Sequence, residues 1–376
     1  MSTISDEFPL ESGLCYLNHA AVAPWPRRAS AAVAAFAEEN STVGARDYPQ
    51  WLKAERRLRE RLMRLLNAPS TGDIALVKNT SEALSFVAFG LDWRTGDQVI
   101  ISDEEFPSNR IVWEALKPFG VDVIPVSLSG HDPEGDLLAA CGPRTRLMAI
   151  SAVQYASGLR LDLPRLGAGC QQRDVLLCVD AIQQLGALPF DAQASNCAFA
   201  MADGHKWMLG PEGLGVFYCR SDLREQLKLH EYGWHMLEHA GDYERSDWQP
   251  DRSARRFECG SPNMLGAMAL EASLSLLEEV GMTRVGALIE ARVQQLQEGL
   301  QQLGACLHSP LNPARRAGIL TFSLDGWDNQ LLFAQLREKQ VICAQRGKGV
   351  RFSPHFYTDP AVLERTLDVL GQLRRG

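Results

Sequence analysis

The segment around Lys206 carries the residue best suited to covalent chemistry. Lys206 follows an apolar run at residues 198–202 and lies between Gly204 and a glycine-rich stretch at residues 210–215. A lysine held in a tight turn under apolar neighbours loses solvation of its ammonium group, which lowers its pKa. A neutral amine can attack a carbonyl carbon and form an imine. The segment therefore predicts an imine-forming lysine, although a surface lysine is the commoner explanation of a single Lys.

A carboxylate follows another apolar run. Asp180 comes directly after residues 175–179, and the amide of Gln183 is three residues further on. A carboxylate at the end of a strand could pair with a protonated ring nitrogen and keep a heterocycle cationic, so that the ring withdraws electrons from a carbanion. Taken alone, Asp180 as the N-cap of a helix is an equally good explanation.

Small hydroxyl residues follow the apolar run at residues 74–77. Thr80 and Ser81 precede an apolar helical pattern, and the free N–H groups at a helix N-terminus attract anions. An ordinary cap formed by Thr80 or Ser81, with Glu82 favouring the helix dipole, is the preferred explanation of this motif when it is considered alone.

The elements that must position these residues follow from hydrophobic patterning. Continuous apolar runs alternate with helical patterns, which predicts α/β architecture with a mostly parallel sheet. We expect a large domain over residues 19–262, and a smaller α+β domain formed by residues 263–376 together with residues 1–18. Ligands bind such sheets at the carboxyl ends of the strands, where the residues above lie. The expected strands are residues 74–77, 98–101, 121–126, 147–150, 175–179, 198–202 and 214–218.

Composition excludes several classes of protein. The 376 residues carry a formal net charge of -8, which provides no broad positive field for a nucleic-acid or membrane partner. The N-terminus lacks a secretory pattern, and no run of apolar residues is long enough to span a bilayer. Nine cysteines without CxxC pairing fit free thiols in a reducing compartment. We therefore expect a cytoplasmic protein.

Several motifs in order resemble the class V aminotransferase family, which includes cysteine desulfurases, selenocysteine lyases, kynureninase and isopenicillin N epimerase. The resemblance runs from Tyr16 to Arg351 and depends most on Gly204-His205-Lys206, the following Gly-Pro-x-Gly-x-Gly, and Asp180-x-x-Gln183. It implies the fold-type I architecture of enzymes that use pyridoxal 5'-phosphate (PLP).

The resemblance assigns roles to the cofactor-binding residues. Lys206 would form the Schiff base, Asp180 would pair with the pyridine nitrogen, and Gln183 would lie near the phenolic oxygen of the ring. Phe106 would stack on the ring. The expected phosphate-binding residues are Thr80, Ser81 and His205, and the remaining cofactor-binding residues are Gln154 and Ser261.

The resemblance also implies a homodimer and a substrate site. The segment that contains Ser261 would reach the phosphate of the neighbouring subunit, so that two subunits share their active sites. Arg351 would bind the α-carboxylate of an amino-acid substrate through its planar guanidinium. The other substrate-binding residues placed by analogy are Asn18, His19 and His355.

Three departures from the family pattern bear on the reaction. Asp203 replaces a phosphate-binding Ser, and we expect its carboxylate to turn away or to lose that role. Tyr155 replaces an Asn that contacts the cofactor. The loop that carries a nucleophilic Cys in desulfurases is deleted, and Cys343 is interpreted as a buried strand residue.

The predicted enzyme acts on an amino acid through a Lys206 aldimine and a Cα carbanion or quinonoid. A desulfurase-like lyase that cleaves a C–S or C–C bond, or an epimerase, is favoured over an aminotransferase. The alternative from another class is a regulator that has the PLP fold but no catalytic activity. Such a protein would not need residues that stabilise a carbanion, so the presence of residues suited to that chemistry argues against it. His230, His235 and His239 could suggest zinc, but they lack a completing ligand, so no metal is expected.

Overall fold

Seven apolar segments form the central sheet of the computed structural model, which describes residues 4–375. The strand order is β2-β8-β7-β6-β5-β3-β4, and only β8 runs antiparallel to its neighbours. Both faces of the sheet are buried, which explains the unbroken apolar runs in the sequence. All seven predicted strands are present, within two residues at each end. They are β2 (Ile74–Val77), β3 (Gln98–Ser102), β4 (Asp122–Val126), β5 (Thr145–Ser151), β6 (Leu176–Asp180), β7 (Phe199–Asp203) and β8 (Gly215–Cys219).

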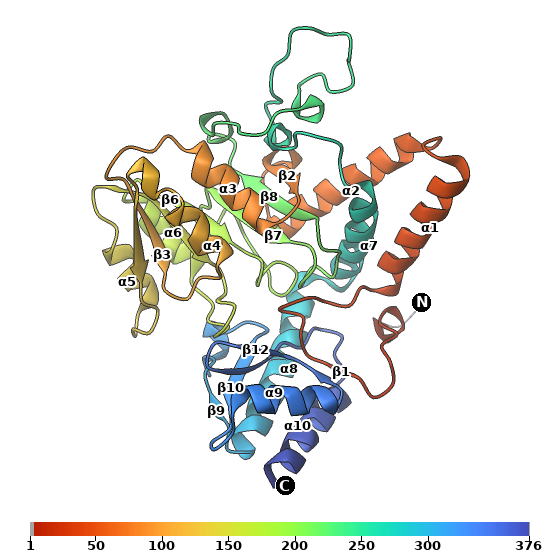
Figure 1. The fold of residues 1–376 in the computed structure, drawn as a ribbon, viewed down its shortest axis with the longest axis vertical. Coiled ribbons are helices and arrows are strands. Elements are labelled where there is room, and N and C mark those ends of the chain that lie inside the picture. The colour runs from red at the N-terminus through yellow and green to blue at the C-terminus, as the bar shows by residue number, and fades with distance from the viewer. Residues whose placement is uncertain (1–3, 376) are drawn as a thin grey trace.

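Helices cover the large sheet in the chain order expected of an α/β fold (Figure 1). The crossover helices are α3 (Thr80–Gly90), α4 (Ser108–Glu114), α5 (Pro133–Ala139) and α6 (Leu163–Gln171). Three longer helices pack on one another beside the sheet, namely α1 (Arg27–Val43), α2 (Tyr48–Leu66) and α7 (Met264–Val280).

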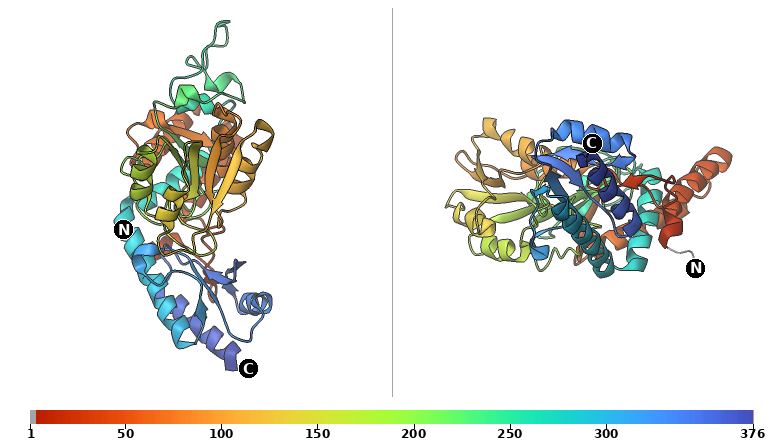
Figure 2. Two further views of the ribbon diagram at one scale, coloured as in Figure 1. Left: turned by 90° about the vertical axis from the view of Figure 1, so that its left-hand side faces the viewer. Right: turned by 90° about the horizontal axis from the view of Figure 1, so that it is seen from below.

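The C-terminal part of the chain forms a smaller α+β unit, coloured cyan to blue in Figure 1, and the left view in Figure 2 shows it below the large sheet. Its four-stranded antiparallel sheet has the order β12-β13-β10-β9. The N-terminal strand β1 (Cys15–Tyr16) pairs with β11 of this unit. The other elements are α8 (Met282–Gln302), β9 (Cys306–Leu307), β10 (Leu320–Ser323), α9 (Asn329–Glu338), β11 (Val341–Ile342), β12 (Ala344–Arg346), β13 (Gly349–Phe352) and α10 (Pro360–Arg375).

The boundary between the two units bears on the domain prediction. Helix α7 begins directly after residue 262, where we expected the small domain to start, but it packs against α1 and α2 of the large unit. The chain enters the small unit with α8, after Gly281, which has a φ of 81°. We therefore propose Gly281, rather than residue 262, as the boundary.

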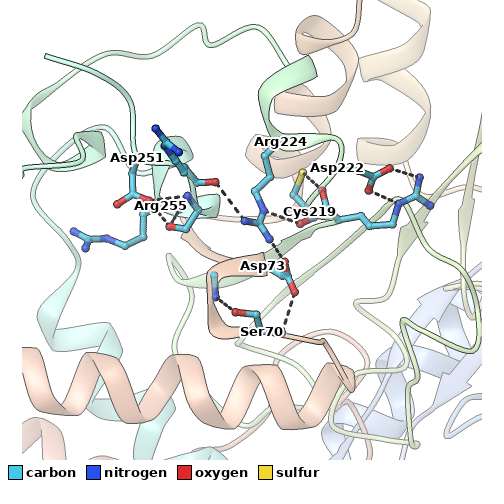
Figure 3. A network of polar contacts seen from close by, with 11 residues as sticks. Ser70, Asp73, Cys219, Asp222, Arg224, Asp251 and Arg255 are labelled. Carbon is cyan, nitrogen blue, oxygen red and sulfur yellow. Dashed lines mark hydrogen bonds and ion pairs between the residues drawn. The ribbon is translucent and has the colours of Figure 1, made fainter.

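Polar contacts hold the edge of the sheet that carries β2 (Figure 3). Asp73 lies directly before β2, and its carboxylate pairs with the guanidinium of Arg224, which follows β8. Asp73 also accepts a hydrogen bond from the backbone N–H of Ser70 at 3.0 Å. Because β2 leads into α3, these contacts help to fix the N-terminus of α3 at the candidate site.

A buried ion triad attaches α2 to the same edge, and its removal is expected to destabilise the protein. The guanidinium of Arg59 donates to Glu55 and Glu258 at 2.6 Å each, and to the backbone oxygen of Ile74 at 3.0 Å. Arg59→Met would leave two buried carboxylates without a cation, so we expect a loss of about 3–5 kcal/mol in the free energy of unfolding. The matched control on the same helix is Arg57→Met, because Arg57 is half exposed in its pair with Glu271; it should cost about 1 kcal/mol or less. Denaturant titration measures both values, and equal losses would contradict this account.

Candidate active site

The predicted catalytic residues meet in one cavity of about 300 Å³ at the carboxyl ends of the large-sheet strands. The small unit contributes Arg346 and Arg351 to the opposite side of this cavity. The predicted residues that line it are Thr80, Ser81, Phe106, Asp180, Gln183, His205, Lys206 and Arg351.

The turn that carries Lys206 is fixed through its own backbone. The carbonyl oxygens of Gly204, His205 and Lys206 accept hydrogen bonds from three different backbone N–H groups, at 2.8 to 3.0 Å. Gly204 has no room for a side chain, since an added Cβ would lie 2.9 Å from the carbonyl oxygen of Leu214. These contacts hold the lysine in place without using its amine.

The electrostatics of the cavity favour a reactive amine. Burial, followed by the positive charges of Arg351 and Arg346, lowers the pKa of the Lys206 ammonium, whereas Asp180 opposes this shift. The Nζ atom lies 5.6 Å from the centroid of the Phe106 ring, which is partly exposed to the cavity. The structure therefore supports the predicted environment of Lys206.

Asp180 is a buried carboxylate that needs a cationic partner. Its carboxylate accepts a hydrogen bond from the N–H of Ile182 at 3.0 Å, and burial raises its pKa. An ionised carboxylate in such a place is stabilised by a neighbouring positive charge. Lys206 supplies part of that charge, and a protonated ring nitrogen would supply more.

Gln183 lines the cavity, but its amide also supports the cavity wall. Its Nε2 donates to the carbonyl oxygen of Ala20 at 3.0 Å, and its Oε1 accepts from Nε1 of Trp207 at 2.8 Å. One hydrogen on Nε2 has no partner within the described part of the chain, so it could still donate to a ring oxygen.

The carboxylate of Asp203 occupies the anion cradle, which is the anion-binding position formed by the free N–H groups at the N-terminus of α3. Its Oδ1 accepts hydrogen bonds from the N–H of Thr80 and, at 3.3 Å, from the Thr80 hydroxyl. The carboxylate does not turn away from this N-terminus, because a helix N-terminus stabilises a carboxylate as well as a phosphate. The other expected outcome, loss of the phosphate-binding role, stays a prediction. The N-cap of α3 is Asn79, whose side chain accepts from Glu82 N, so neither Thr80 nor Ser81 caps the helix as suggested above.

This arrangement predicts that Asp203 competes with the phosphate of the cofactor. Asp203→Asn should tighten the binding of PLP, and of inorganic phosphate to the apoenzyme, by about tenfold, because it removes a negative charge from the cradle. Dissociation constants from absorbance titration and calorimetry measure the effect, and Asp191→Asn, outside the cavity, is the control. Weaker binding in Asp203→Asn would instead mean that Asp203 helps to hold the phosphate.

Several predicted site residues do not line this cavity. Gln154 is buried behind it, with its amide near Glu105 at 3.4 Å. Ser261 lines a second cavity of about 380 Å³. His19 bonds to the carbonyl of Ser353 and the hydroxyl of Tyr357. Asn18 and His355 also lie outside the lining, and Nε2 of His355 contacts the carbonyl oxygen of Trp207 at 3.1 Å.

The buried histidines predict a loss of stability in acid. Burial lowers the pKa of His19 to about 4 and that of His355 well below its ordinary value. Above pH ~6.5 the imidazoles are neutral in both folded and unfolded chains; below it, only the unfolded chain takes up the protons. Stability should therefore fall as the pH drops from about 6.5 towards 4, with His19 alone contributing on the order of 2 kcal/mol at pH ~5.

Denaturant titrations at a series of pH values test this expectation. His19→Gln should be less stable than the parent protein at neutral pH but should lose less stability on acidification. His131→Gln, at an exposed position, should leave the slope of unfolding free energy against pH the same as in the parent protein. An unchanged slope in His19→Gln would contradict the assignment.

Sequence reasoning missed four kinds of contribution to the cavity. The backbone after β1 supplies residues 20–22, α4 supplies Ser108, and the glycine-rich stretch supplies Glu212. Arg346 comes from β12. Of these, Arg346 had a detectable signal, because it precedes Arg351 by five residues with Gly-Lys-Gly-Val between them.

The structure gives no support to a zinc site. His235 lies in a 3-10 helix of three residues and His239 in a turn beyond it, so they do not share a helix face. No group of three or more His, Cys, Asp or Glu side chains within residues 4–375 could hold a metal ion.

No helix within residues 4–375 is long and apolar enough to cross a membrane.

Together, the fold and the cavity define a PLP-dependent enzyme of fold type I. The apo structure of cysteine desulfurase from Thermococcus onnurineus NA1 matches with a TM-score of 0.89 and 23% identity, covering 100% of this chain and 99% of that chain. The complex between the cystine C–S lyase C-DES and its reaction product cysteine persulfide matches with a TM-score of 0.89 and 24% identity, covering 96% and 98%. These likenesses establish the fold.

Sequence comparison establishes the family. The model of the aminotransferase class-V family matches residues 15–363, and the chain belongs to this family. A probable cysteine desulfurase of Methanothermobacter thermautotrophicus is 31% identical over 351 residues, which cover 91% of this chain and 86% of the relative. A cysteine desulfurase of Klebsiella pneumoniae is 30% identical, covering 83% and 78%. The predicted family, fold class, enzyme class and cofactor are confirmed, as is the desulfurase-like character of the predicted function.

The cavity fits PLP. It holds a lysine amine, a buried carboxylate and helix N–H groups, and Nδ1 of His205 is buried there without a hydrogen-bond partner in the described chain. Lys206 would hold the aldehyde carbon of the cofactor, Asp180 the ring nitrogen and Phe106 a ring face. Thr80, Ser81 and His205 would hold the phosphate once Asp203 releases the Thr80 N–H. When bound, PLP supplies an electron sink for a carbanion at Cα of an amino acid.

Proposed function

We propose that the protein is a C–S lyase that breaks the Cβ–S bond of a cysteine-type amino acid by β-elimination. The sulfur leaves with any group attached to it, and water converts the remaining fragment to pyruvate and ammonia. The observation that supports it most strongly is the shared cavity of Lys206, Asp180 and Arg351. The curated relatives above are named cysteine desulfurases, which also break a C–S bond.

Arg351 is the proposed site of the substrate α-carboxylate. Its side chain is buried, and Nη1 donates to the carbonyl oxygen of Tyr155 at 2.7 Å. Its Nε and Nη2 atoms are buried and have no partner in the described chain. A planar guanidinium with two free donors can bind a carboxylate through paired hydrogen bonds. The carboxylate would also compensate the cost of burying the cation.

Lys206 is the proposed base at Cα. Because its pKa is lowered, the amine is neutral more often near neutral pH than an ordinary lysine and can accept the Cα proton. The same group can then deliver a proton to the departing sulfur or to the product. Asp180 would keep the ring nitrogen of the bound cofactor protonated.

The cysteines favour elimination over transfer of sulfur to the protein. Among the residues that the structure describes, no cysteine lines the cavity. Cys343 lies between β11 and β12 rather than within a strand, and burial raises its pKa to about 12. A thiol with so high a pKa is a poor nucleophile. Sulfur would therefore leave with its substituent or as sulfide, without a persulfide on Cys343.

Product analysis with L-cysteine and S-substituted cysteines tests the proposal. Elimination yields pyruvate and ammonia. Formation of alanine would indicate desulfuration, a new amino acid formed from a 2-oxo acid would indicate transamination, and loss of a Cα deuterium label without net change would indicate epimerisation. Any of these three as the main outcome would overturn the elimination proposal, and failure of every amino acid to perturb the cofactor spectrum would favour a regulatory binder.

We also propose a homodimer in which the segment around Ser261 completes the partner's site, and a cytoplasmic location. The segment supports this because Ser261 lines a cavity other than that of its own Lys206. Light scattering gives the oligomeric state. In a dimer, mixing Lys206→Ala with Ser261→Trp subunits should restore about a quarter of full activity, because one site of each hybrid pair is intact. A monomer, or no recovery, would contradict shared sites.

A further inference from the structure

A second arginine faces the substrate cavity. The tip of the β12–β13 hairpin carries Arg346, which pairs with Gly349, and Arg351 lies two residues further along β13. Residues in this diagonal relationship project from the same face of a sheet, with Cβ atoms roughly 7 Å apart. Both side chains line the cavity that contains Lys206. The hairpin therefore presents two guanidinium groups to one ligand.

The hairpin turn fixes the backbone position of Arg346, whose side chain is exposed. Residues 347 and 348 form the whole connection between the paired residues Arg346 and Gly349. Gly347 has a φ of 56°, in the left-handed region that glycine adopts readily, and an added Cβ would lie 3.1 Å from Cβ of Ala156. So short a turn leaves little freedom at its base, where Arg346 is attached.

The two guanidinium groups have no anionic partner in the described chain. The one hydrogen bond found for the Arg346 guanidinium goes to the carbonyl oxygen of Gln345, and no described carboxylate forms an ion pair with either arginine. Arg346 also contributes to lowering the pKa of both Arg351 and Lys206. This concentration of positive charge is unfavourable until anions enter the cavity.

The carboxylates that line the cavity lie elsewhere in it. Asp180 accepts from Ile182 N, and Asp203 accepts from Thr80 N. Glu212 belongs to the glycine-rich stretch after Lys206, is exposed, and interacts electrostatically with Asp203, whose pKa it helps to raise. The side that faces the small unit is therefore cationic, with one arginine more than a single α-carboxylate requires.

We infer that Arg346 binds a second anionic group on the substrate, so that the preferred substrate is an S-substituted cysteine whose sulfur substituent ends in a carboxylate. This inference rests on the proposed lyase function and names the substrate class. Arg351 binds the α-carboxylate, and Arg346 binds the distal one. Elimination breaks the Cβ–S bond, and the acidic thiol leaves with the electron pair and a proton, while water converts the remaining fragment to pyruvate and ammonia.

Two isosteric probes test the second site on the holoenzyme. S-carboxymethyl-L-cysteine carries the distal carboxylate, and S-carbamoylmethyl-L-cysteine replaces it with a neutral amide of the same shape. We expect the carboxylate probe to have a kcat/KM about 10-fold or more above that of the amide, mostly through KM. Arg346→Gln should abolish this preference, and Arg346→Lys should retain part of it.

A control and a second readout separate the possible outcomes. Lys348→Gln removes a cation from the same turn, at a position outside the lining, and should keep the preference. Arg346→Gln should also raise the pKa of Lys206, measured from the pH dependence of amine modification in the apoenzyme, because it removes a neighbouring positive charge. Equal kcat/KM for both probes in the parent protein, or an unchanged preference in Arg346→Gln, would overturn the inference. If neither probe is cleaved but the carboxylate probe binds more tightly in a manner that depends on Arg346, the second site stands and the lyase proposal fails.

Discussion

Replacement of Lys206 by alanine is expected to reduce turnover by about 10³-fold or more, because it removes both the amine that attaches the cofactor and the base at Cα. The fold should survive, since the turn is held by backbone carbonyl groups rather than by the amine. Stopped-flow or steady-state rates with the best amino acid measure the loss, and the thermal unfolding midpoint reports on folding.

Lys206→Arg is the matched control. It keeps the positive charge beside Asp180 but cannot act as a base or form the covalent link, because a guanidinium remains protonated. It should therefore be as inactive as Lys206→Ala. Addition of a small primary amine should restore part of the activity of Lys206→Ala but not of Lys206→Arg, because only the alanine variant leaves space for the added amine. Full activity in either variant would disprove the proposed role.

The second large effect is expected at Asp180. Asp180→Ala or Asp180→Asn removes the buried carboxylate that would keep the ring nitrogen protonated, so the rate of Cα deuterium exchange should fall by about 10²-fold or more. The loss should appear in kcat, with a much smaller change in the affinity for the α-carboxylate, because Arg351 is unaltered. Rates of exchange and of turnover are measured on the same protein with cofactor bound.

A second carboxylate of the cavity serves as the control for Asp180. Glu212→Gln removes a negative charge at an exposed position on the same cavity, at the side of Asp203. It should leave Cα exchange within about threefold of the parent value, because exposed charges interact weakly. Equal losses in Asp180→Asn and Glu212→Gln would mean that net charge, rather than a ring-nitrogen contact, explains the effect.

The strands and the chemistry could be predicted from the sequence because each leaves a local signal. Strand β6 is a continuous apolar run that ends in Asp180, and β7 ends one turn before Lys206. The short strands β1, β9 and β12 were not predicted, whereas a strand was expected next to Cys343, where β11 lies. Each has only two or three residues and depends on pairing with distant segments, for example Cys15 with Val341.

The directions of side chains could not be predicted from local patterns. Asp203 was expected to turn away from the phosphate site or to lose the phosphate-binding role, and in the folded chain its carboxylate accepts a hydrogen bond from the N–H of Thr80. His19 and His355 were placed near the substrate by resemblance, whereas tertiary contacts bury both behind the cavity wall. Arg346 enters the cavity only because β12 and β13 form a hairpin. For Asp203, His19 and His355 the deciding contact joins segments far apart in the sequence, for example Thr80 with Asp203.

The most direct test is to reduce the protein with borohydride after incubation with PLP and to map the modified peptide by mass spectrometry. We predict one cofactor per chain, attached to Lys206 within the segment Gly204-His205-Lys206-Trp207. Attachment at a different lysine, or folded protein that acquires no cofactor, would contradict the account.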